Sequence, residues 1–100
     1  MDAPAAFGGR ALLVGGGKRT VLSGNRVVIG RSRDCDVTLD DPNVSRRHAE
    51  LRRDGATWVI ADLGSTNGVK VNGRRIQGPQ SLKRGDVIEL GTSSVTFDLE

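Results

Sequence analysis

The sequence predicts a single all-β domain, a sandwich of two mainly antiparallel sheets. Short apolar stretches alternate with turn residues at intervals of about 8 to 12 residues, a spacing typical of antiparallel sandwiches and barrels. The 14 glycines of the chain provide for many tight turns, and no stretch has the period of an amphipathic helix. A chain of 100 residues hides about two-thirds of its unfolded surface on folding, which is enough for one core.

The apolar stretches predict strands, in chain order, at residues 10–14, 19–22, 27–30, 36–39, 48–53, 57–62, 69–72, 74–77, 86–91 and 94–99. Most of the joints between them carry residues that tolerate positive φ, from Gly15-Gly16-Gly17 after the first strand to Asp54-Gly55 after the fifth. Asn72-Gly73 separates Val69-x-Val71 from Arg74-x-Ile76. Because Asn-Gly is the preferred two-residue turn of a β-hairpin, the local prediction is firmest here.

The core is expected to consist of the large apolar side chains, which two packed sheets must bury. We expect them to be Val28, Leu51, Trp58, Ile60, Leu63, Val71, Ile76, Ile88, Leu90 and Phe97. Aromatic residues make up only 3% of the chain. Trp58 and Phe97 are therefore assigned to packing and not to ligand stacking.

Three fragments place polar groups where expected strands end: Gly30-Arg31, Ser45-Arg46-Arg47-His48 and Ser65-Thr66-Asn67-Gly68. Each alone has an ordinary structural explanation as a turn or an exposed arginine. Loops of a sandwich gather at its ends, so the three fragments are able to converge on one pocket. Guanidinium, hydroxyl and backbone N–H groups together suit an anion, and we expect a phosphate on a partner protein.

A catalytic role for Ser45 and His48, three residues apart, is an alternative interpretation. The chain has no G-x-S-x-G elbow and no acid whose placement would orient the imidazole. We therefore expect His48 to bond backbone groups and hold the Ser45 loop in place. A lone histidine and the single cysteine, Cys35, also exclude the usual zinc sites and any internal disulfide, so we expect no metal and no cofactor.

Several segments taken together resemble a forkhead-associated (FHA) domain. They are residues 27–31, Asp36-Val37-Thr38-Leu39, Val44-Ser45-Arg46-Arg47-His48-Ala49, residues 62–68 and Val71-Asn72-Gly73. The resemblance spans residues 10 to 99 and includes each signature segment in order. It implies an eleven-stranded, antiparallel-rich β-sandwich that binds phosphothreonine peptides without catalysis, and the composition is most similar to bacterial, actinobacterial members that serve Ser/Thr kinase signalling.

The resemblance also implies roles for individual residues. Arg31 and Ser45 would bind phosphate oxygens, Arg46 would add a contact, Thr66 would support the phosphate and threonine pocket, and Asn67 would hold the peptide backbone. Gly30, His48 and Gly68 would shape the loops. Residues outside the signature, such as Arg33, Asn43, Gly64 and Lys70, follow no fixed pattern, so the peptide preference is left open.

Other classes of function are less well supported. The net charge of +3 favours anionic partners, but the arginines are interleaved with carboxylates and exposed aromatic residues are scarce, which argues against nucleic acid. Gly15-Gly16-Gly17-Lys18 is not a P-loop, because Leu12 stands where that motif needs Gly and Arg19 stands where it needs Ser or Thr. The group Asp34, Asp36, Asp40 and Asp41 lacks the spacing of a calcium loop, so we interpret it as solvated charge.

The sequence also allows expectations about the cellular location of the protein and the boundaries of its domain. No apolar run approaches the roughly 20 residues that cross a bilayer, and residues 1–9 do not resemble a secretory signal. We expect a loose tail at residues 1–9, one domain at residues 10–100 and a reducing, cytoplasmic setting. The isolated domain is expected to be a monomer that binds phosphothreonine-containing proteins, with neither nucleic acid nor membrane insertion.

Overall fold

The computed structural model describes residues 10–100, and the tail expected at residues 1–9 lies outside this range. The described chain forms eleven strands in two sheets and no helix. The strands are β2 (Ala11–Gly15), β3 (Lys18–Val21), β4 (Arg26–Gly30), β5 (Val37–Thr38), β6 (Ala49–Asp54), β7 (Thr57–Asp62), β8 (Val69–Val71), β9 (Arg74–Arg75), β10 (Gln80–Leu82), β11 (Val87–Leu90) and β12 (Ser93–Leu99). The predicted fold class is confirmed.

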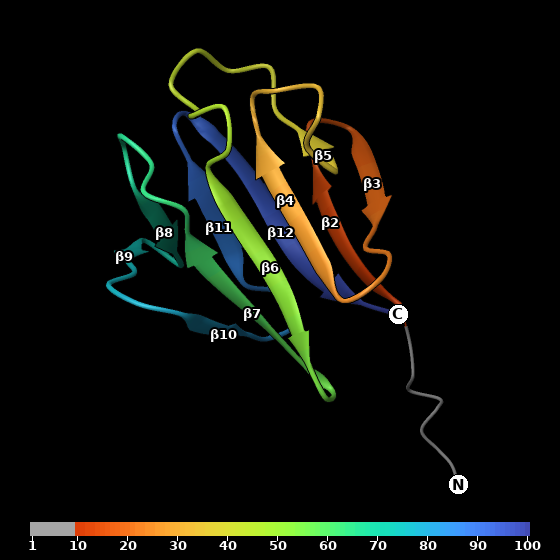
Figure 1. Ribbon diagram of the computed structural model, residues 1–100. Coiled ribbons are helices and arrows are strands. Elements are labelled where there is room, and N and C mark those ends of the chain that lie inside the picture. The colour runs from red at the N-terminus through yellow and green to blue at the C-terminus, as the bar shows by residue number, and fades with distance from the viewer. Residues whose placement is uncertain (1–9) are drawn as a thin grey trace, which may run out of the picture.

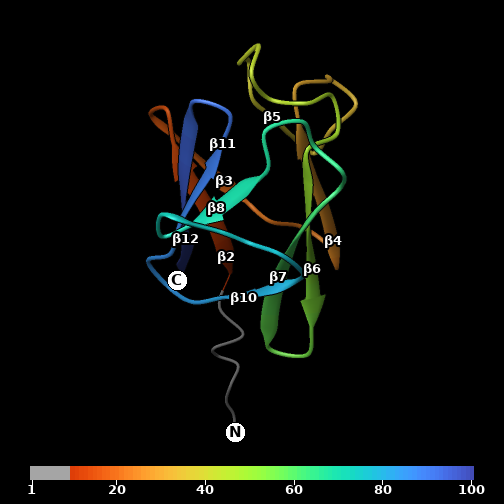
Figure 2. The ribbon, with the colours of Figure 1, turned by 90° about the vertical axis from the view of Figure 1, so that its left-hand side faces the viewer.

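The two sheets lie face to face as a sandwich (Figures 1 and 2). One sheet has the order β10-β7-β6-β4-β5, and the other has the order β3-β2-β12-β11-β8-β9. All pairings are antiparallel except that of β4 with β5, which is parallel. Strands β9 and β10 are therefore edge strands of different sheets, and they lie on the same side of the molecule (Figure 1).

The hairpin predicted from Asn72-Gly73 is confirmed. Asn72 has φ 52° and Gly73 has φ 82°, and they connect β8 to β9 with Val71 opposite Arg74. The strand β10 was not predicted, because Pro79-Gln80-Ser81-Leu82 shows no apolar alternation. It forms by pairing with β7, where Leu82 lies opposite Trp58 and is buried.

The core lies between the sheets, and eight of the ten residues expected to form it are buried. Val28 is buried outside the central cluster, and the other seven pack within it: Leu51, Trp58, Ile60, Val71, Ile88, Leu90 and Phe97. Ile76 is half-buried against the core. The prediction was wrong for Leu63, which is 37% exposed because it follows the last residue of β7 and lies in a loop. Val27 and Ile29 were overlooked, although they alternate with Val28 and pack in the central cluster.

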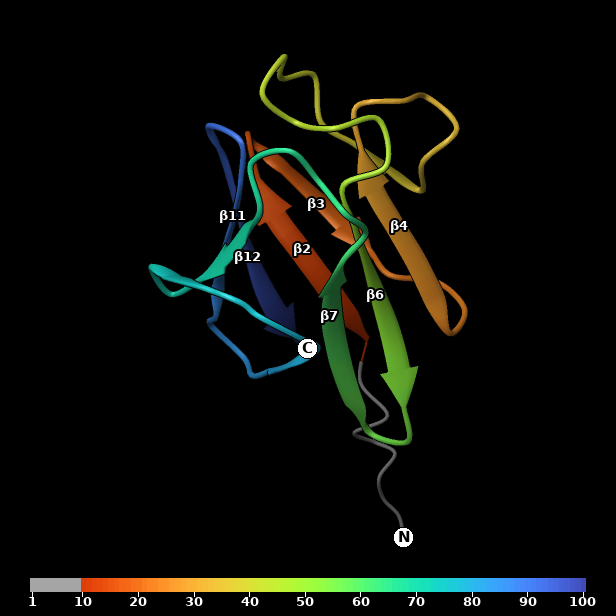
Figure 3. The ribbon, with the colours of Figure 1, turned by 60° about the vertical axis from the view of Figure 1, so that its left-hand side comes forward.

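The loops after β4, β5 and β7 lie at the same end of the sandwich, together with the β11–β12 turn (Figures 1 and 3). The C-terminus lies at the opposite end (Figure 1). We call these the loop end and the terminal end. The two sheets therefore hold three long loops side by side, so that polar residues of all three are able to meet at the loop end.

Candidate functional site

Residues from three loops line one concavity of about 540 Å3 at the loop end. Its lining residues are Arg31, Pro42, Asn43, Val44, Ser45, Arg46, Thr66 and Asn67. The loops are bonded to one another, since the N–H of Arg31 donates to the carbonyl of Ser45 at 3.0 Å and the N–H of Thr66 donates to Oγ of Ser45 at 3.1 Å. The structure thus brings together all five residues that the sequence named as candidate contacts.

Arg31 directly follows β4, where Gly30 lets the chain pass close to the next loop. A Cβ on Gly30 would overlap the carbonyl oxygen of Arg46 and lie 2.9 Å from Sγ of Cys35. Nε of Arg31 donates to the carbonyl of Val44 at 3.0 Å, which fixes the direction of the exposed guanidinium. Because a guanidinium has five N–H donors, the two terminal nitrogens keep theirs for a ligand.

Ser45 is half-buried and uses its hydroxyl oxygen as an acceptor for the N–H of Thr66. A hydroxyl has one donor and two acceptor positions, so the O–H of Ser45 is left to donate into the concavity. The backbone N–H of Ser45 is already used, because it donates to Nδ1 of His48 at 3.0 Å. The side chain, and not the main chain, is the group that Ser45 offers to an anion.

His48 is fully buried between the Ser45 loop and the β7–β8 loop. Its Nδ1 accepts the N–H of Ser45, so Nε2 carries the proton and donates to the carbonyl of Gly68 at 2.7 Å. Both ring nitrogens are occupied by backbone groups. The imidazole therefore holds two loops together and has no free nitrogen with which to act as a base.

Asn67 and Arg46 are exposed at the rim of the concavity. Nδ2 of Asn67 donates to the carbonyl of Asn43 at 2.7 Å, and this bond leaves its Oδ1 able to accept a further hydrogen bond. The carbonyl of Arg46 accepts the N–H of Ser32 at 3.1 Å and the thiol of Cys35. The backbone of Arg46 is thereby fixed while its guanidinium extends from the surface.

The turn Ser65-Thr66-Asn67-Gly68 is closed by side chains as well as by backbone. The N–H of Ser65 donates to Oδ1 of Asp62 at 2.8 Å, and Oγ of Ser65 accepts the N–H of Gly68 at 2.9 Å. Gly68 has φ +77°, a conformation that favours glycine. These bonds orient the N–H of Thr66 toward Ser45 and the amide of Asn67 toward Asn43.

Asp41 is a structural residue of the site that sequence reasoning assigned wrongly. It was interpreted as a solvated charge, but only 5% of it is exposed. Its Oδ2 accepts the hydroxyl and the N–H of Thr92 at 2.7 and 2.9 Å and the hydroxyl of Ser93 at 2.8 Å, while Oδ1 accepts the N–H of Asn43 at 2.8 Å. The hydroxyl of Thr92 first, then the N–H of Asn43 and the hydroxyl of Ser93, hold the pKa of Asp41 well below its usual range.

Asp41 attaches the loop between β5 and β6 to the β11–β12 turn. A Cβ on Gly91 would lie 2.7 Å from the carbonyl carbon of Asn43, so this turn packs directly on the loop. The same segment supplies the carbonyls that orient Asn67 and Arg31. Only the contact with Asn43 is local in sequence; Thr92 and Ser93 lie about fifty residues away and give no sequence signal.

Cys35 is buried beneath the loops, where its thiol donates to the carbonyl of Arg46 at 3.1 Å. Burial raises the pKa of this thiol above its ordinary value. It therefore behaves as a packed, protonated side chain. Across residues 10–100, no three His, Cys, Asp or Glu side chains are grouped as ligands for a metal ion. In the same range no helix is long and apolar enough to cross a membrane.

Comparison with known proteins was made on sequence and on structure. The FHA domain model matches residues 27–91. The chain is 42% identical over 94 residues to an oxoglutarate dehydrogenase inhibitor of Corynebacterium jeikeium, covering 89% of this chain and 65% of that protein. It is 36% identical over 115 residues to the glycogen accumulation regulator GarA of Mycolicibacterium smegmatis, covering 97% of this chain and 72% of the regulator.

Another relative is the FHA domain-containing protein FhaA of Mycobacterium tuberculosis, which is 46% identical over 81 residues; the match covers 81% of this chain and 15% of FhaA. The chain thus spans less than two thirds of the Corynebacterium inhibitor and a small part of FhaA. The organisms agree with the actinobacterial resemblance.

Solved structures agree with these relatives. Mycobacterium tuberculosis EmbR in complex with a low-affinity phosphopeptide superposes with a TM-score of 0.88 at 37% identity, covering 92% of this chain and 25% of that chain. An FHA domain studied for phosphothreonine-dependent interactions superposes with a TM-score of 0.84 at 38% identity, covering 91% of this chain and 97% of that chain.

Proposed function

The chain belongs to the FHA domain family, and we propose that it is a phosphothreonine-dependent binding module that recognises phosphorylated partner proteins in Ser/Thr kinase signalling. The observation that carries this proposal is the convergence of Arg31, Ser45, Arg46, Thr66 and Asn67 on one concavity. The solved complex of EmbR with a phosphopeptide adds support from a similar fold. We assign the binding module to residues 10–100.

The phosphate group is assigned to Arg31 and Ser45. A phosphate monoester carries about −1.5 to −2 charges and three acceptor oxygens. The terminal nitrogens of Arg31 and the hydroxyl of Ser45 are the donors left after their structural bonds are made. Hydrogen bonds to charged groups contribute about 1.5–3 kcal/mol each. After ordering costs, two or three of them correspond to micromolar affinity, about −8 kcal/mol.

The remaining residues orient the peptide. Arg46 adds a second guanidinium at the rim, Thr66 supports the phosphate and threonine pocket, and the free Oδ1 of Asn67 accepts a peptide N–H. Gly30, His48 and Gly68 act indirectly, through the close approach and the bonds that shape the loops. The site recognises a modified residue together with the main chain beside it.

We propose that the domain binds without catalysing a reaction. Both ring nitrogens of His48 are bonded to backbone groups, and the lining of the concavity includes no other base that would activate the hydroxyl of Ser45 as a nucleophile. A relative named as an enzyme inhibitor and another named as a regulator agree with this role. We further propose that the protein is cytoplasmic, because a buried free cysteine suits a reducing compartment. We also propose that the isolated domain is a monomer.

Titration calorimetry with a degenerate phosphothreonine peptide library tests the proposal. We expect binding to phosphothreonine peptides, weaker binding to phosphoserine peptides and none to phosphotyrosine or unmodified peptides. In Arg31→Ala we expect at least a hundredfold loss of affinity, because two charge-assisted bonds disappear. Arg84→Ala removes an exposed arginine that pairs with Asp98 instead, and it is the matched control. Unchanged affinity in Arg31→Ala would refute the site assignment.

A further inference from the structure

A second concavity is lined by residues of the two edge strands β9 and β10 and of the segments beside them. It measures about 430 Å3, and its lining includes Asn72, Arg74, Arg75, Gln77, Gln80 and Lys83. We call it the edge groove. It is separate from the concavity of the loop end, since the two share none of their lining residues.

The edge groove is surrounded by cations that form no ion pair within residues 10–100. Arg74, Arg75 and Lys83 line it; Lys70 lies opposite Arg75 in the register of β8 and β9 and opposite Glu89 in the register of β8 and β11. In the described chain, ion pairs use the arginines at positions 10, 19, 26, 52 and 84. The cations of the groove therefore remain available to an external anion.

Two carboxylates beside these cations form hydrogen bonds within the fold: Asp86 lines the groove itself, and Asp62 lines a neighbouring hollow together with Arg75. Asp86 accepts Nδ2 of Asn72 at 2.9 Å and the N–H of Lys83 at 2.7 Å, and Asp62 accepts the N–H of Ser65 at 2.8 Å. Charged residues on edge strands also discourage pairing with other chains, which accounts for cations here in general. Edge protection does not explain why the carboxylates here bond to backbone and amide groups while the guanidinium groups of the groove stay unpaired.

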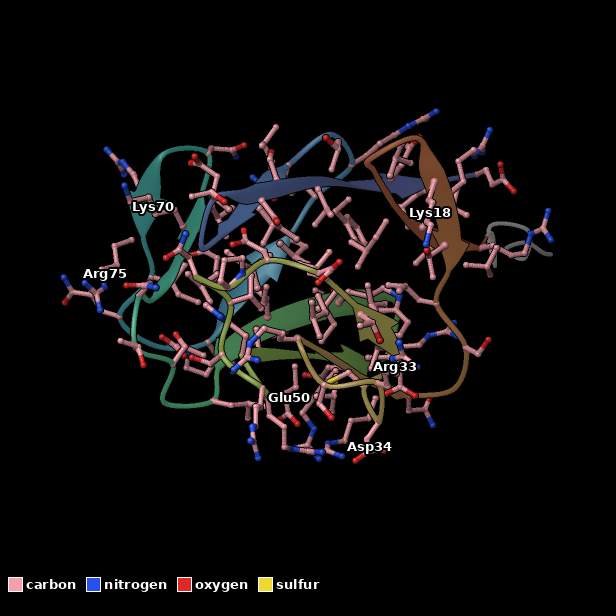
Figure 4. The ribbon with its side chains drawn as sticks, turned by 90° about the horizontal axis from the view of Figure 1, so that it is seen from above. Lys18, Arg33, Asp34, Glu50, Lys70 and Arg75 are labelled. Carbon is pink, nitrogen blue, oxygen red and sulfur yellow. The ribbon has the colours of Figure 1, made fainter. Side chains whose placement is uncertain are left out.

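Arg75 connects the edge groove to the peptide-binding loops. A Cβ on Gly68 would lie 2.7 Å from Nε and 2.8 Å from Cζ of Arg75, so the guanidinium lies directly against the turn that carries Thr66 and Asn67. Seen from above the loop end, Lys70 and Arg75 stand on one side of the molecule and Lys18 on another (Figure 4). A chain bound at Asn67 would meet Arg75 when it leaves the loops toward β9.

We propose that the edge groove binds an acidic segment of the same phosphorylated partner, so that phosphothreonine is bound at the loop end and neighbouring Asp or Glu residues are bound by Arg74, Arg75 and Lys83. This inference rests on the proposed function and adds a second contact to it. Linked contacts increase affinity, because the second binds at a high effective concentration. Acidic residues fit the groove because three cations, Arg74, Arg75 and Lys83, line it against the one carboxylate of Asp86.

The test uses three phosphothreonine peptides: a short one, and two lengthened by about eight residues that contain four glutamates, placed before the phosphothreonine in one and after it in the other. At low salt we expect one lengthened peptide to bind about tenfold more tightly than the short one. We expect this gain in affinity to vanish in the double variant Arg74→Gln/Lys83→Gln. The control is the double variant Lys18→Gln/Arg53→Gln, which removes the same charge from exposed positions outside the groove, and in it we expect the gain to persist.

The outcomes separate the two proposals. If the short phosphopeptide fails to bind the wild-type protein, the proposed function fails. If the short peptide binds and neither lengthened peptide gains, or both double variants lose the gain equally, the edge groove is not a docking surface. A single-stranded oligonucleotide that displaces the lengthened peptide to the level of the short one at moderate salt, in the wild type only, would assign the groove to nucleic acid and overturn the proposal.

Discussion

The loop end and the terminal end of this sandwich use their charged groups differently. At the terminal end, Glu100 pairs with Arg10 at 2.8 Å and Arg19 at 2.7 Å, and Asp98 pairs with Arg84 at 3.1 Å. At the loop end, Arg31 and Arg46 have no carboxylate partner within the described residues, and the one buried carboxylate, Asp41, bonds to hydroxyl and N–H groups.

The difference shows how a binding surface is kept open without destabilising the fold. The backbone carbonyl of Val44, and not a carboxylate, orients Arg31, so its position is fixed while its charge is unneutralised. Polar side chains such as His48 and Asp41 connect the loops to one another. Exposed ion pairs such as those of the terminal end contribute little to stability. The predictions below test whether the two ends respond to substitution as differently as this comparison implies.

The largest effect is expected at Gly30, which lies in close contact with the loop that carries Arg46. A methyl group in Gly30→Ala would overlap the carbonyl oxygen of Arg46, a backbone atom that moves only with the loop. We expect a loss of about 3 kcal/mol in the free energy of unfolding, measured by urea denaturation, together with loss of phosphopeptide binding. Gly78→Ala is the control, because nothing lies within 4 Å of a Cβ there. Equal stability of the two variants would contradict the close approach.

The next effect is expected at His48, the fully buried link between two loops. His48→Ala leaves the N–H of Ser45 and the carbonyl of Gly68 without their partners. We expect the free energy of unfolding to fall by about 2–3 kcal/mol and affinity for the phosphopeptide to fall with it, as measured by thermal melting and calorimetry. Unchanged melting with abolished binding would instead make His48 a direct ligand of the peptide.

A pH-dependent effect is expected at Asp41. Its pKa is lowered in the folded protein, so its ionised form contributes stability above the ordinary aspartate pKa of about 3.9, and this contribution is lost as the pH falls below that value toward the folded pKa. We expect Asp41→Asn to melt at a lower temperature than the wild type at pH 7 and to differ less from it at pH 3. The neighbouring exposed Asp40, changed to Asn, is the control. A constant difference across this range would rule out the carboxylate as the stabilising group.

The sequence predicted those features that depend on neighbouring residues. Asn72-Gly73 formed the expected hairpin because its turn chemistry is local. The signature fragments around Arg31, Ser45 and Thr66 met at one end because the loops of a sandwich gather at its ends. Asp41 was misassigned because its partners, Thr92 and Ser93, come from a turn about fifty residues away.

Strand β10 and the edge groove could not be predicted from the sequence either, because they too depend on contacts between distant segments. The segment Gln80–Leu82 has no apolar alternation, and its strand conformation is imposed by pairing with β7. The contact between Arg75 and Gly68 depends on where β9 places its side chains relative to a preceding loop. Features created by the meeting of distant segments give no local pattern, whereas tight turns and the signature fragments of the loops do.

The smallest effect is expected at the terminal end. Glu100→Gln removes both ion pairs of this carboxylate, with Arg10 and with Arg19. Because these groups are exposed and screened, we expect a loss of about 0.5 kcal/mol or less at low salt and none in 1 M salt, with unchanged phosphopeptide affinity. Thermal melting at the two salt concentrations and calorimetry provide the measurements. A loss of binding comparable to that of the loop-end variants would show that the two ends are coupled, contrary to the separation of roles that their hydrogen bonds and ion pairs indicate.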